Sequence, residues 1–264
     1  MLWDTTPALA RFDAIIPAGG VLPEPFAAKV GVRNKALITF NGRTMLAGTL
    51  QALQESGDVR NTILVTDDEV GKHPDAASAT ILPAGRSAPA NILAALRHLA
   101  GSPDRAERVL VVTSDLPYLT GGMLKDFIDR CPSDKDFCVP LVTAEEYEAR
   151  FPGSTSSYVK LTDGRWTIGG TYLVKTDAFE KALPHIERAF EQRKSTLGMV
   201  KLLGPSFAIK FLTKRLSVPN VLGKVESIIG ASGYPVKGAA ADLAYDIDDE
   251  IDYDYALKQI ESHG

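Results

Sequence analysis

Apolar residues follow two different periods in the first half of the chain. Short apolar and β-branched runs bounded by turn residues predict four buried parallel strands, at Phe12–Ala18, Thr62–Asp67, Thr80–Pro83 and Val109–Asp115. Between these runs, apolar residues recur at helical spacing, for example at Met45, Leu46, Leu50 and Leu53. Because strand and helix alternate, we predict a doubly wound α/β sheet that binds ligands outside the carboxyl ends of its strands.

The second half of the chain has a different rhythm. Phe137–Val142 predicts one more strand, and Ser154–Leu161 with Gly164–Val174 predict a pair of strands joined by a tight turn. Asp177–Gln192 places its apolar residues on one stripe of a helix. We therefore expect this half to be antiparallel or mixed. The sequence has no low-complexity linker, which favours one compact domain over residues 1–264.

The amino-acid composition of the chain limits the kinds of partner that it can bind. The chain has 264 residues, 45% of them hydrophobic, and its 29 Lys and Arg against 33 Asp and Glu give a net charge of -4. This mild acidity argues against a dedicated nucleic-acid binder, so an anionic ligand would have to be captured by a local group of residues.

Three sequence features bear on location and redox state. The longest stretch without a charged residue, Thr44–Gln54, is far shorter than the roughly 18 apolar residues that span a bilayer. The N-terminus lacks a basic region followed by an apolar stretch and a cleavage site, so we expect a cytoplasmic protein. Cys131 and Cys138 lack metal-site spacing and are expected to be free thiols.

A basic segment, Arg188–Lys224, lies within this acidic chain and contains a single acid, Glu191. Its apolar residues fit two interpretations. One is helical structure that covers an edge of the sheet and leaves its lysines in water. The other is a face that contacts an anionic substrate or a membrane surface. The sequence leaves both open.

The first candidate chemical element follows the first predicted strand. The sequence Pro17-Ala18-Gly19-Gly20 turns out of an apolar run, and Lys35 follows. Glycines let backbone N–H groups approach a phosphate, and a lysine supplies a point charge for the same anion. The pattern is neither a Walker A loop nor a GxGxxG fingerprint, and a simple tight turn would explain the glycines equally well.

A second candidate element ends the strand that begins at Val109. The apolar run delivers one carboxylate, Asp115, where ligands bind in open α/β sheets. Asp115 is poorly placed for core packing and well placed for a divalent cation, although an aspartate capping the turn before Pro117 is the structural alternative.

A third candidate element lies near the C-terminus. The alternation of Asp246, Ile247 and Asp248 predicts a short strand with both aspartates on one face. Glu250 and Asp252 would then lie in the first turn of a final helix, where negative charge is favourable. Two aspartates on one face resemble half of a magnesium site.

In this order, the three elements resemble the MobA-like nucleotidyltransferases of the GT-A-type nucleoside-diphosphate-sugar transferase superfamily. The resemblance covers roughly residues 12–258 and includes Asn41–Leu46 and Gly169–Val174. It implies a three-layer α/β/α fold, GT-A-like and Rossmann-like, with a mixed, mainly parallel sheet. Residues 1–130 would form the NTP-binding half and residues 131–264 the acceptor-binding half, which contains the basic helical segment 188–224.

The resemblance also implies a reaction. An oxyanion on a small phosphorylated acceptor attacks the α-phosphorus of an NTP and pyrophosphate leaves, which requires charge neutralisation and alignment more than a general base. Lys35 and Asp115 would be catalytic, and Mg²⁺ would be held by Asp115 with Asp248 or, as second choice, Asp246. The nucleotide would contact Pro17, Ala18, Gly19, Gly20, Lys35, Gly85, Arg86, Asn91 and Ser114. The acceptor would contact Lys160, Gly169, Gly170, Arg193 and Lys194. Nucleic acid is not an expected partner, and a homodimer is left open.

The chain departs from the family pattern after the first strand. Such families commonly carry G-G-x-G-T-R-M there, whereas this chain has neither the third glycine nor the arginine. Either Lys29 or Arg33 supplies the missing charge, or nucleotide binding is weaker.

Three other functions are weighed against nucleotidyl transfer. A GT-A glycosyltransferase normally carries Asp-x-Asp where this chain has a single Asp115. An NAD-dependent oxidoreductase would need the missing fingerprint glycines. A non-catalytic nucleotide-binding relative would explain the altered loop, but it would not explain why Lys35, Asp115 and Asp248 are all present.

Overall fold

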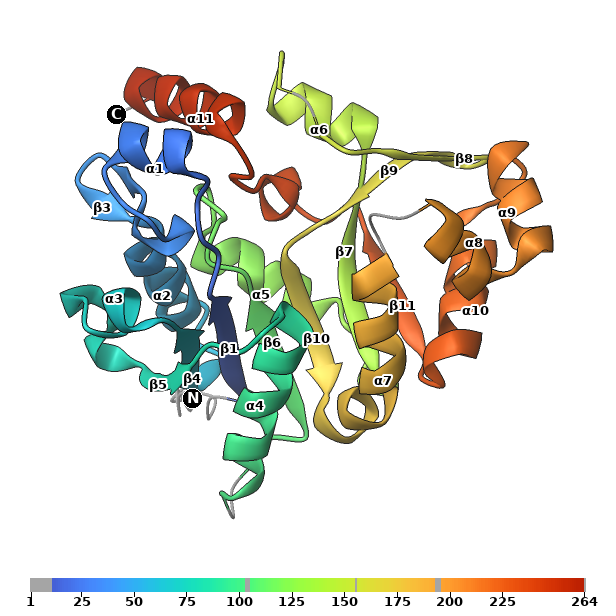
Figure 1. The fold of residues 1–264 in the computed structure, drawn as a ribbon, viewed down its shortest axis with the longest axis horizontal. Helices are drawn as coiled ribbons and strands as arrows, with labels where there is room; N and C mark the ends of the chain where they lie inside the picture. The colour runs from blue at the N-terminus through green and yellow to red at the C-terminus, as the bar shows by residue number, and fades with distance from the viewer. Residues whose placement is uncertain (1–10, 103–104, 155, 193–195, 264) are drawn as a thin grey trace, which may run out of the picture.

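The computed structural model describes residues 11–102, 105–154, 156–192 and 196–263. Most of its strands belong to one sheet (Figure 1). The strands of this sheet are β1 (Phe12–Ala18), β4 (Val59–Thr66), β5 (Thr80–Pro83), β6 (Arg108–Val112), β7 (Phe137–Thr143), β8 (Val159–Leu161), β9 (Gly164–Ile168), β10 (Thr171–Lys175) and β11 (Gly233–Lys237). A separate two-stranded ladder joins β2 (Thr39–Phe40) and β3 (Arg43–Thr44).

The strand order is β5-β4-β1-β6-β10-β7-β9-β8, and β11 pairs with β7. Strands β5, β4, β1 and β6 run parallel, whereas β10 is antiparallel to both β6 and β7. The sheet is therefore mixed with a parallel core, as the sequence predicts. Because β10 from the second half pairs with β6 from the first, both halves share one sheet. This arrangement supports the single-domain organisation, which stays a prediction.

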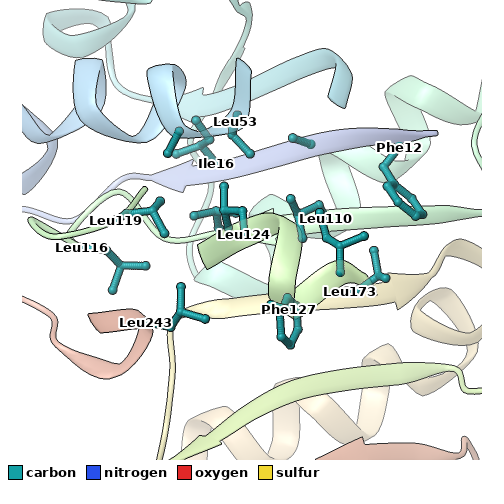
Figure 2. Packing of buried hydrophobic residues seen from close by; sticks show 14 of the residues in the cluster. Phe12, Ile16, Leu53, Leu110, Leu116, Leu119, Leu124, Phe127, Leu173 and Leu243 are labelled. Atoms are coloured by element: carbon teal, nitrogen blue, oxygen red, sulfur yellow. The ribbon is translucent and has the colours of Figure 1, made fainter. Parts of the chain in front are cut away.

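Helices cover both faces of the sheet and make three layers. Helices α2 (Met45–Glu55) and α5 (Gly121–Asp129) pack on one face, and α4 (Ala88–Ala100) and α7 (Thr176–Gln192) pack on the other. The period of two within β1 explains this division, because Ile16 faces the α2 and α5 side whereas Ile15 faces α4 and α7. Figure 2 shows the first of these cores, with Ile16, Leu53 and Phe127 packed between the sheet and its helices.

The remaining helices lie at the ends and edges of the sheet. They are α1 (Glu24–Val30), α3 (Asp68–Gly71), α6 (Ala144–Arg150), α8 (Thr196–Leu203), α9 (Pro205–Leu212), α10 (Val218–Ile229) and α11 (Glu250–His263), with three 3-10 helices at Lys35–Leu37, Pro74–Ser78 and Ala241–Ala244. Within the described part of the chain, no helix is long and apolar enough to cross a membrane. Both cysteines are free and buried, as predicted.

The predicted strands agree closely at β1 and β5. Strand β4 begins earlier than predicted, at Val59, and β8 covers only Val159–Leu161 of the predicted Ser154–Leu161. Three further predictions need correction. The run Gly164–Val174 is not one strand, because Gly169 and Gly170 separate β9 from β10. Strand β6 ends at Val112, and Thr113 to Asp115 form the loop beyond it. The third correction, at Asp246–Asp248, concerns the site and is described below.

The described residues of the basic segment form the end of α7 together with α8, α9 and most of α10. Figure 1 shows α8 and α9 beside the end of the sheet that carries β8, and this position fits both interpretations of the segment. Helix α9 leaves Ile209, Phe211 and Leu212 exposed to solvent.

Candidate active site

The predicted chemical elements meet at one edge of the sheet. Strands β1 and β6 are parallel, so the Gly19-Gly20 turn and the Asp115 loop leave the sheet on the same side. Strand β11 is parallel to β7, which is antiparallel to β10 and therefore runs in the direction of β6. The chain that follows β11 returns to this edge and carries Asp246 and Asp248. Such an edge is where open α/β sheets bind ligands.

Lys35 joins the glycine turn to the carboxylates. Its backbone N–H donates to the carbonyl of Gly20, 2.9 Å away, and its aliphatic stem lies beside Gly20. Its ammonium group lies 2.7 Å from Oδ1 of Asp248 and 3.6 Å from Oδ2 of Asp115. The lysine that follows the first strand is thus positioned between a candidate phosphate loop and a candidate cation site.

Asn34 positions this lysine, although the sequence reasoning did not select it. Asn34 is 1% exposed, and its amide donates to the carbonyl of Ala18 and to the carboxylate of Asp67, both at 2.9 Å. Its Oδ1 accepts the N–H of Ala36 and begins the short 3-10 helix at Lys35–Leu37. An asparagine directly before a short helix is a recognisable cap, so the sequence held a signal for the turn but not for its link to β1.

Three carboxylates form the acidic part of the site. One oxygen each of Asp115, Asp246 and Asp248 lie within 4.8 Å of one another. Oδ1 of Asp115 is buried and has no hydrogen-bond partner among the described residues. An oxygen-rich group with an unpartnered buried oxygen suits a hard divalent cation such as Mg²⁺, so the residues present fit the implied metal.

The segment around Asp246 and Asp248 is not the predicted strand. It is an irregular loop held by one backbone hydrogen bond, from the N–H of Ile247 to the carbonyl of Asp115 at 3.0 Å. Ile247 is fully buried whereas both aspartates are exposed. Buried and exposed residues therefore alternate here as predicted, although the segment pairs with no strand. The prediction of the strand was wrong, but the three carboxylates still meet.

Asp252 fastens this acidic loop from the start of α11. Its Oδ2 accepts the N–H groups of Asp248 and Asp249, at 3.0 and 3.2 Å. Asp249 in turn accepts the N–H groups of Ile251 and Asp252. Glu250 and Asp252 lie in the first turn of α11, as predicted, and the loop is locked against the helix.

The clustered charges shift the pKa values of two groups. Burial by itself lowers the pKa of Lys35, but the nearby charges of Asp115 and Asp248 outweigh it and raise the pKa above its ordinary value. The pKa of Asp246 rises to about 7. The first cause is that its carboxyl group is surrounded by protein and loses hydration, although the residue as a whole is exposed, and the second is that Asp115 and Asp248 repel its charge. The cluster therefore holds more negative charge than Lys35 alone balances.

The predicted base-contact residues lie on the other side of the glycine turn. Asn91 is buried, and its Oδ1 accepts the N–H of Gly85 at 2.6 Å. A Cβ built on Gly19 would approach Ala84 and the amide of Asn91, so the two loops pack closely. Arg86 is exposed between them. Ser87 caps α4 by accepting the N–H of Ala90.

Lys29 and Arg33, the two residues offered for the missing charge, have different surroundings. The Lys29 ammonium lies 2.7 Å from Asp254 and 3.4 Å from Glu250, both on α11. It is therefore engaged as a bridge between α1 and α11. Arg33 is exposed on the loop that leads to Lys35. Of the two, Arg33 is the better candidate for a phosphate.

The predicted acceptor residues are scattered. Gly169 and Gly170 lie at the site edge, where their N–H groups donate to the carbonyls of Pro140 and Leu243. Lys160 is exposed on β8, at the far end of the sheet from β1. Arg193 and Lys194 lie outside the described residues. Ser114 is buried directly before Asp115. The roles of these residues stay predictions.

A family model for the MobA-like NTP transferase domain matches residues 14–202. The chain belongs to this family of nucleotidyltransferases. The match contains the glycine turn, Lys35 and Asp115, whereas the acidic loop and the last helices lie beyond it. No curated protein matches the chain in sequence.

Solved structures of similar shape agree with the family. A hypothetical transferase from Thermus thermophilus is 31% identical, with a TM-score of 0.80, and the match covers 92% of this chain and 99% of that one. A nucleotidyl transferase from Methanothermobacter is 17% identical with a TM-score of 0.58, covering 96% and 99%. The 2-C-methyl-D-erythritol 4-phosphate cytidylyltransferase from Thermus thermophilus is 17% identical with a TM-score of 0.55, covering 95% and 99%. The last two show similarity of fold.

Proposed function

We propose that this member of the MobA-like NTP transferase family transfers a nucleoside monophosphate from an NTP to a phosphorylated acceptor and releases pyrophosphate, with Mg²⁺ as cofactor. One observation carries the proposal. Lys35 spans the space between the Gly19-Gly20 turn and the carboxylates of Asp115 and Asp248. A triphosphate that bound between these groups would contact backbone amides on one side and a cation on the other.

Each group has a role that its position supports. The backbone of Ala18, Gly19 and Gly20 would hold the β- and γ-phosphates. Lys35, which is charged at neutral pH, would offset the negative charge that grows on the leaving pyrophosphate. Asn34 would keep Lys35 in place through its hydrogen bonds to β1. No general base is needed, because the attacking phosphate oxygen is already ionised.

Asp115, Asp246 and Asp248 would hold the metal. A bound Mg²⁺ neutralises phosphate charge and aligns the reacting groups. Because the pKa of Asp246 is raised to about 7, its carboxyl group must lose a proton before it can act as a ligand. Gly85, Arg86 and Asn91 remain the proposed contacts for the base and ribose.

The test is a pyrophosphate-release assay with Mg²⁺ and each of the four NTPs against a panel of phosphorylated acceptors. We expect release with at least one pair and its loss in Asp115→Asn. Asp68→Asn is the matched control, because Asp68 is an exposed aspartate paired with Lys72. If the protein binds an NTP but releases no pyrophosphate with any acceptor, and Asp115→Asn binds the NTP as tightly as the parent protein, the non-catalytic alternative is favoured instead.

A further inference from the structure

A large cavity begins at the acidic loop and extends away from the nucleotide side of the site. Its volume is about 1330 Å³, and one end is lined by Asp246, Asp248, Asp249 and Asp252. From there it passes Ser156 and Thr167 and continues between the sheet and helices α7 and α10. The glycine turn, Gly85 and Asn91 do not line it, so this space lies on the acceptor side of the carboxylates.

The far walls of the cavity are apolar. They include Val159 on β8, Ile168 on β9, Tyr234 on β11 and Val225 on α10. Ile168 is 58% exposed and Val225 is 40% exposed, so these side chains face solvent rather than a packed core. Contiguous exposed apolar surface of this kind commonly marks a binding groove. A small phosphorylated acceptor at the acidic end would leave these walls uncovered.

The charges along the cavity constrain how a ligand lies in it. No lysine or arginine belongs to the described residues that line it. Four of its five acids lie at the acidic loop, and the fifth, Glu226 on α10, accepts the N–H of Gly233. The negative group of a ligand can therefore be held only where Lys35 and a cation on Asp115, Asp246 and Asp248 balance those acids. The rest of the ligand must be largely apolar, because it contacts valine, isoleucine and tyrosine side chains.

We propose that the acceptor is an amphiphile, a phosphate monoester on a long hydrocarbon chain, whose phosphate lies at the carboxylates and whose chain lies in the groove between β9 and α10. The inference rests on the proposed function, because it takes the carboxylate end as the place of the reacting phosphate. In the reaction, a phosphate oxygen of the amphiphile forms a bond to the α-phosphorus of the NTP. The bond from that phosphorus to the bridging oxygen breaks, and pyrophosphate leaves with its electron pair.

A second feature supports an acceptor of this kind. Helix α9 lies near this end of the sheet and exposes Ile209, Phe211 and Leu212 beside Lys210. Partly buried Phe207, on the same helix, packs against a buried cluster that includes Trp166 and Val218, and these two residues line the cavity. The apolar and basic surface of α9 is therefore connected to the cavity through this cluster, and such a surface is suited to receive a molecule with a hydrocarbon chain and a phosphate.

Binding of alkyl phosphates tests the inference without turnover. Butyl, hexyl, octyl and decyl phosphate would be titrated below their micellar concentrations by calorimetry, with Mg²⁺ and no NTP. Burying a methylene group strengthens binding roughly fourfold, so decyl phosphate, which has four more methylene groups, should bind about 250-fold more tightly than hexyl phosphate. Equal affinities across the series would overturn the inference.

Variants locate the chain in the groove. Val225→Gln should weaken decyl phosphate binding by about tenfold and leave butyl phosphate binding unchanged. Ile81→Gln is the matched control, because Ile81 is 38% exposed, close to the exposure of Val225, and does not line the cavity. If both variants bind decyl phosphate as tightly as the parent protein, the groove is not the site.

The outcomes separate this inference from the proposed function. Chain-length-dependent binding without pyrophosphate release for any NTP would sustain the groove and overturn the reaction. Pyrophosphate release that is equal for butyl and decyl phosphate would sustain the reaction and overturn the groove. A protein that light scattering shows to be dimeric, that Val225→Gln makes monomeric and that binds no alkyl phosphate would assign the groove to a second copy of the chain. Vesicles containing decyl phosphate, compared with the free monomer, show whether the amphiphile is taken from a lipid surface.

Discussion

Lys35 and Asp248 are far apart in the sequence, yet the lysine Nζ lies 2.7 Å from the aspartate Oδ1. The lysine begins the short 3-10 helix that follows α1, and the aspartate lies in the loop between the last 3-10 helix and α11. Their contact connects the two ends of the chain across the carboxyl edge of the sheet. Lys35 therefore contacts the carboxylates through its ammonium group and the glycine turn through its backbone.

We predict that Lys35→Ala weakens NTP binding by about tenfold, because a positive charge beside the triphosphate is lost. It should also lower the stability of the metal-free protein by about 1 kcal/mol, since Asp115 and Asp248 lose their counter-charge. Mg²⁺ should then raise the melting temperature of the variant more than that of the parent protein. Calorimetry and thermal unfolding measure the two effects, with Lys72→Ala as the exposed control. An NTP affinity equal to that of the parent protein would remove Lys35 from the site.

Asp115→Asn should reduce Mg²⁺-dependent pyrophosphate release by about 10²- to 10³-fold, because an electrostatic group at the reacting centre is lost. Its stability should stay within about 1 kcal/mol of the parent protein, since asparagine keeps the shape of the side chain and Oδ1 has no hydrogen-bond partner to lose. Steady-state kinetics and chemical unfolding test both parts. Retained turnover would show that Asp115 is not a metal ligand.

Gly169→Ala should destabilise the fold by about 1 to 3 kcal/mol. A Cβ at this position would lie 2.7 Å from the ring of Pro140 and would also collide with the backbone of Leu243, just before the acidic loop. Gly122→Ala in α5 is the matched control, because nothing lies within 4 Å of its Cβ, and alanine should stabilise the helix by about 0.5 kcal/mol. Urea unfolding of both variants makes the comparison. Equal stabilities would mean that Gly169 is not required by packing.

The ion pair between buried Asp13 and partly exposed Arg60 should make stability depend on acidic pH. Asp13 is 1% exposed, and burial by itself raises its pKa, but hydrogen bonds from Arg60, Asn61 and the N–H of Ala106 outweigh burial and lower the pKa below its ordinary value. A lowered folded pKa adds stability that is complete above the unfolded pKa of about 3.9 and is lost as pH falls through the folded pKa.

Asp13→Asn should therefore cost about 2 kcal/mol at pH 7, because the charged hydrogen bonds from Arg60 are weakened. The difference between variant and parent should shrink as pH falls below about 4. Unfolding by urea at several pH values measures this difference. Asp68→Asn, an exposed aspartate that pairs with Lys72, serves as the control. A difference that stays constant from pH 7 to pH 3 would contradict the assignment.

Patterns in the amino-acid sequence were enough to predict most of the strands and helices and to select the candidate site residues. Strands β1 and β5 and helix α7 follow from apolar periods that act over a few residues. The order of the glycine turn, Asp115 and the acidic loop indicated the family. The prediction of a short strand at Asp246–Asp248 was wrong. The polar-apolar-polar alternation arises because Ile247 alone is buried, and a loop can bury one residue without pairing with a neighbouring strand.

Tertiary structure decided what those residues do together. The strand order brings Asp115 and Asp248 within ion-pair distance of Lys35. The apolar periods of single strands and helices do not predict this order. The sequence indicates that Gly169 and Gly170 are site residues, but packing also requires glycine there. The backbone of Leu243 leaves no room for a Cβ at Gly169, and the side chain of Thr113 leaves none at Gly170. The cavity exists only because β9, β11, α7 and α10 enclose one space. Side chains far apart in sequence form its walls, so its apolar character could emerge only once the chain had folded.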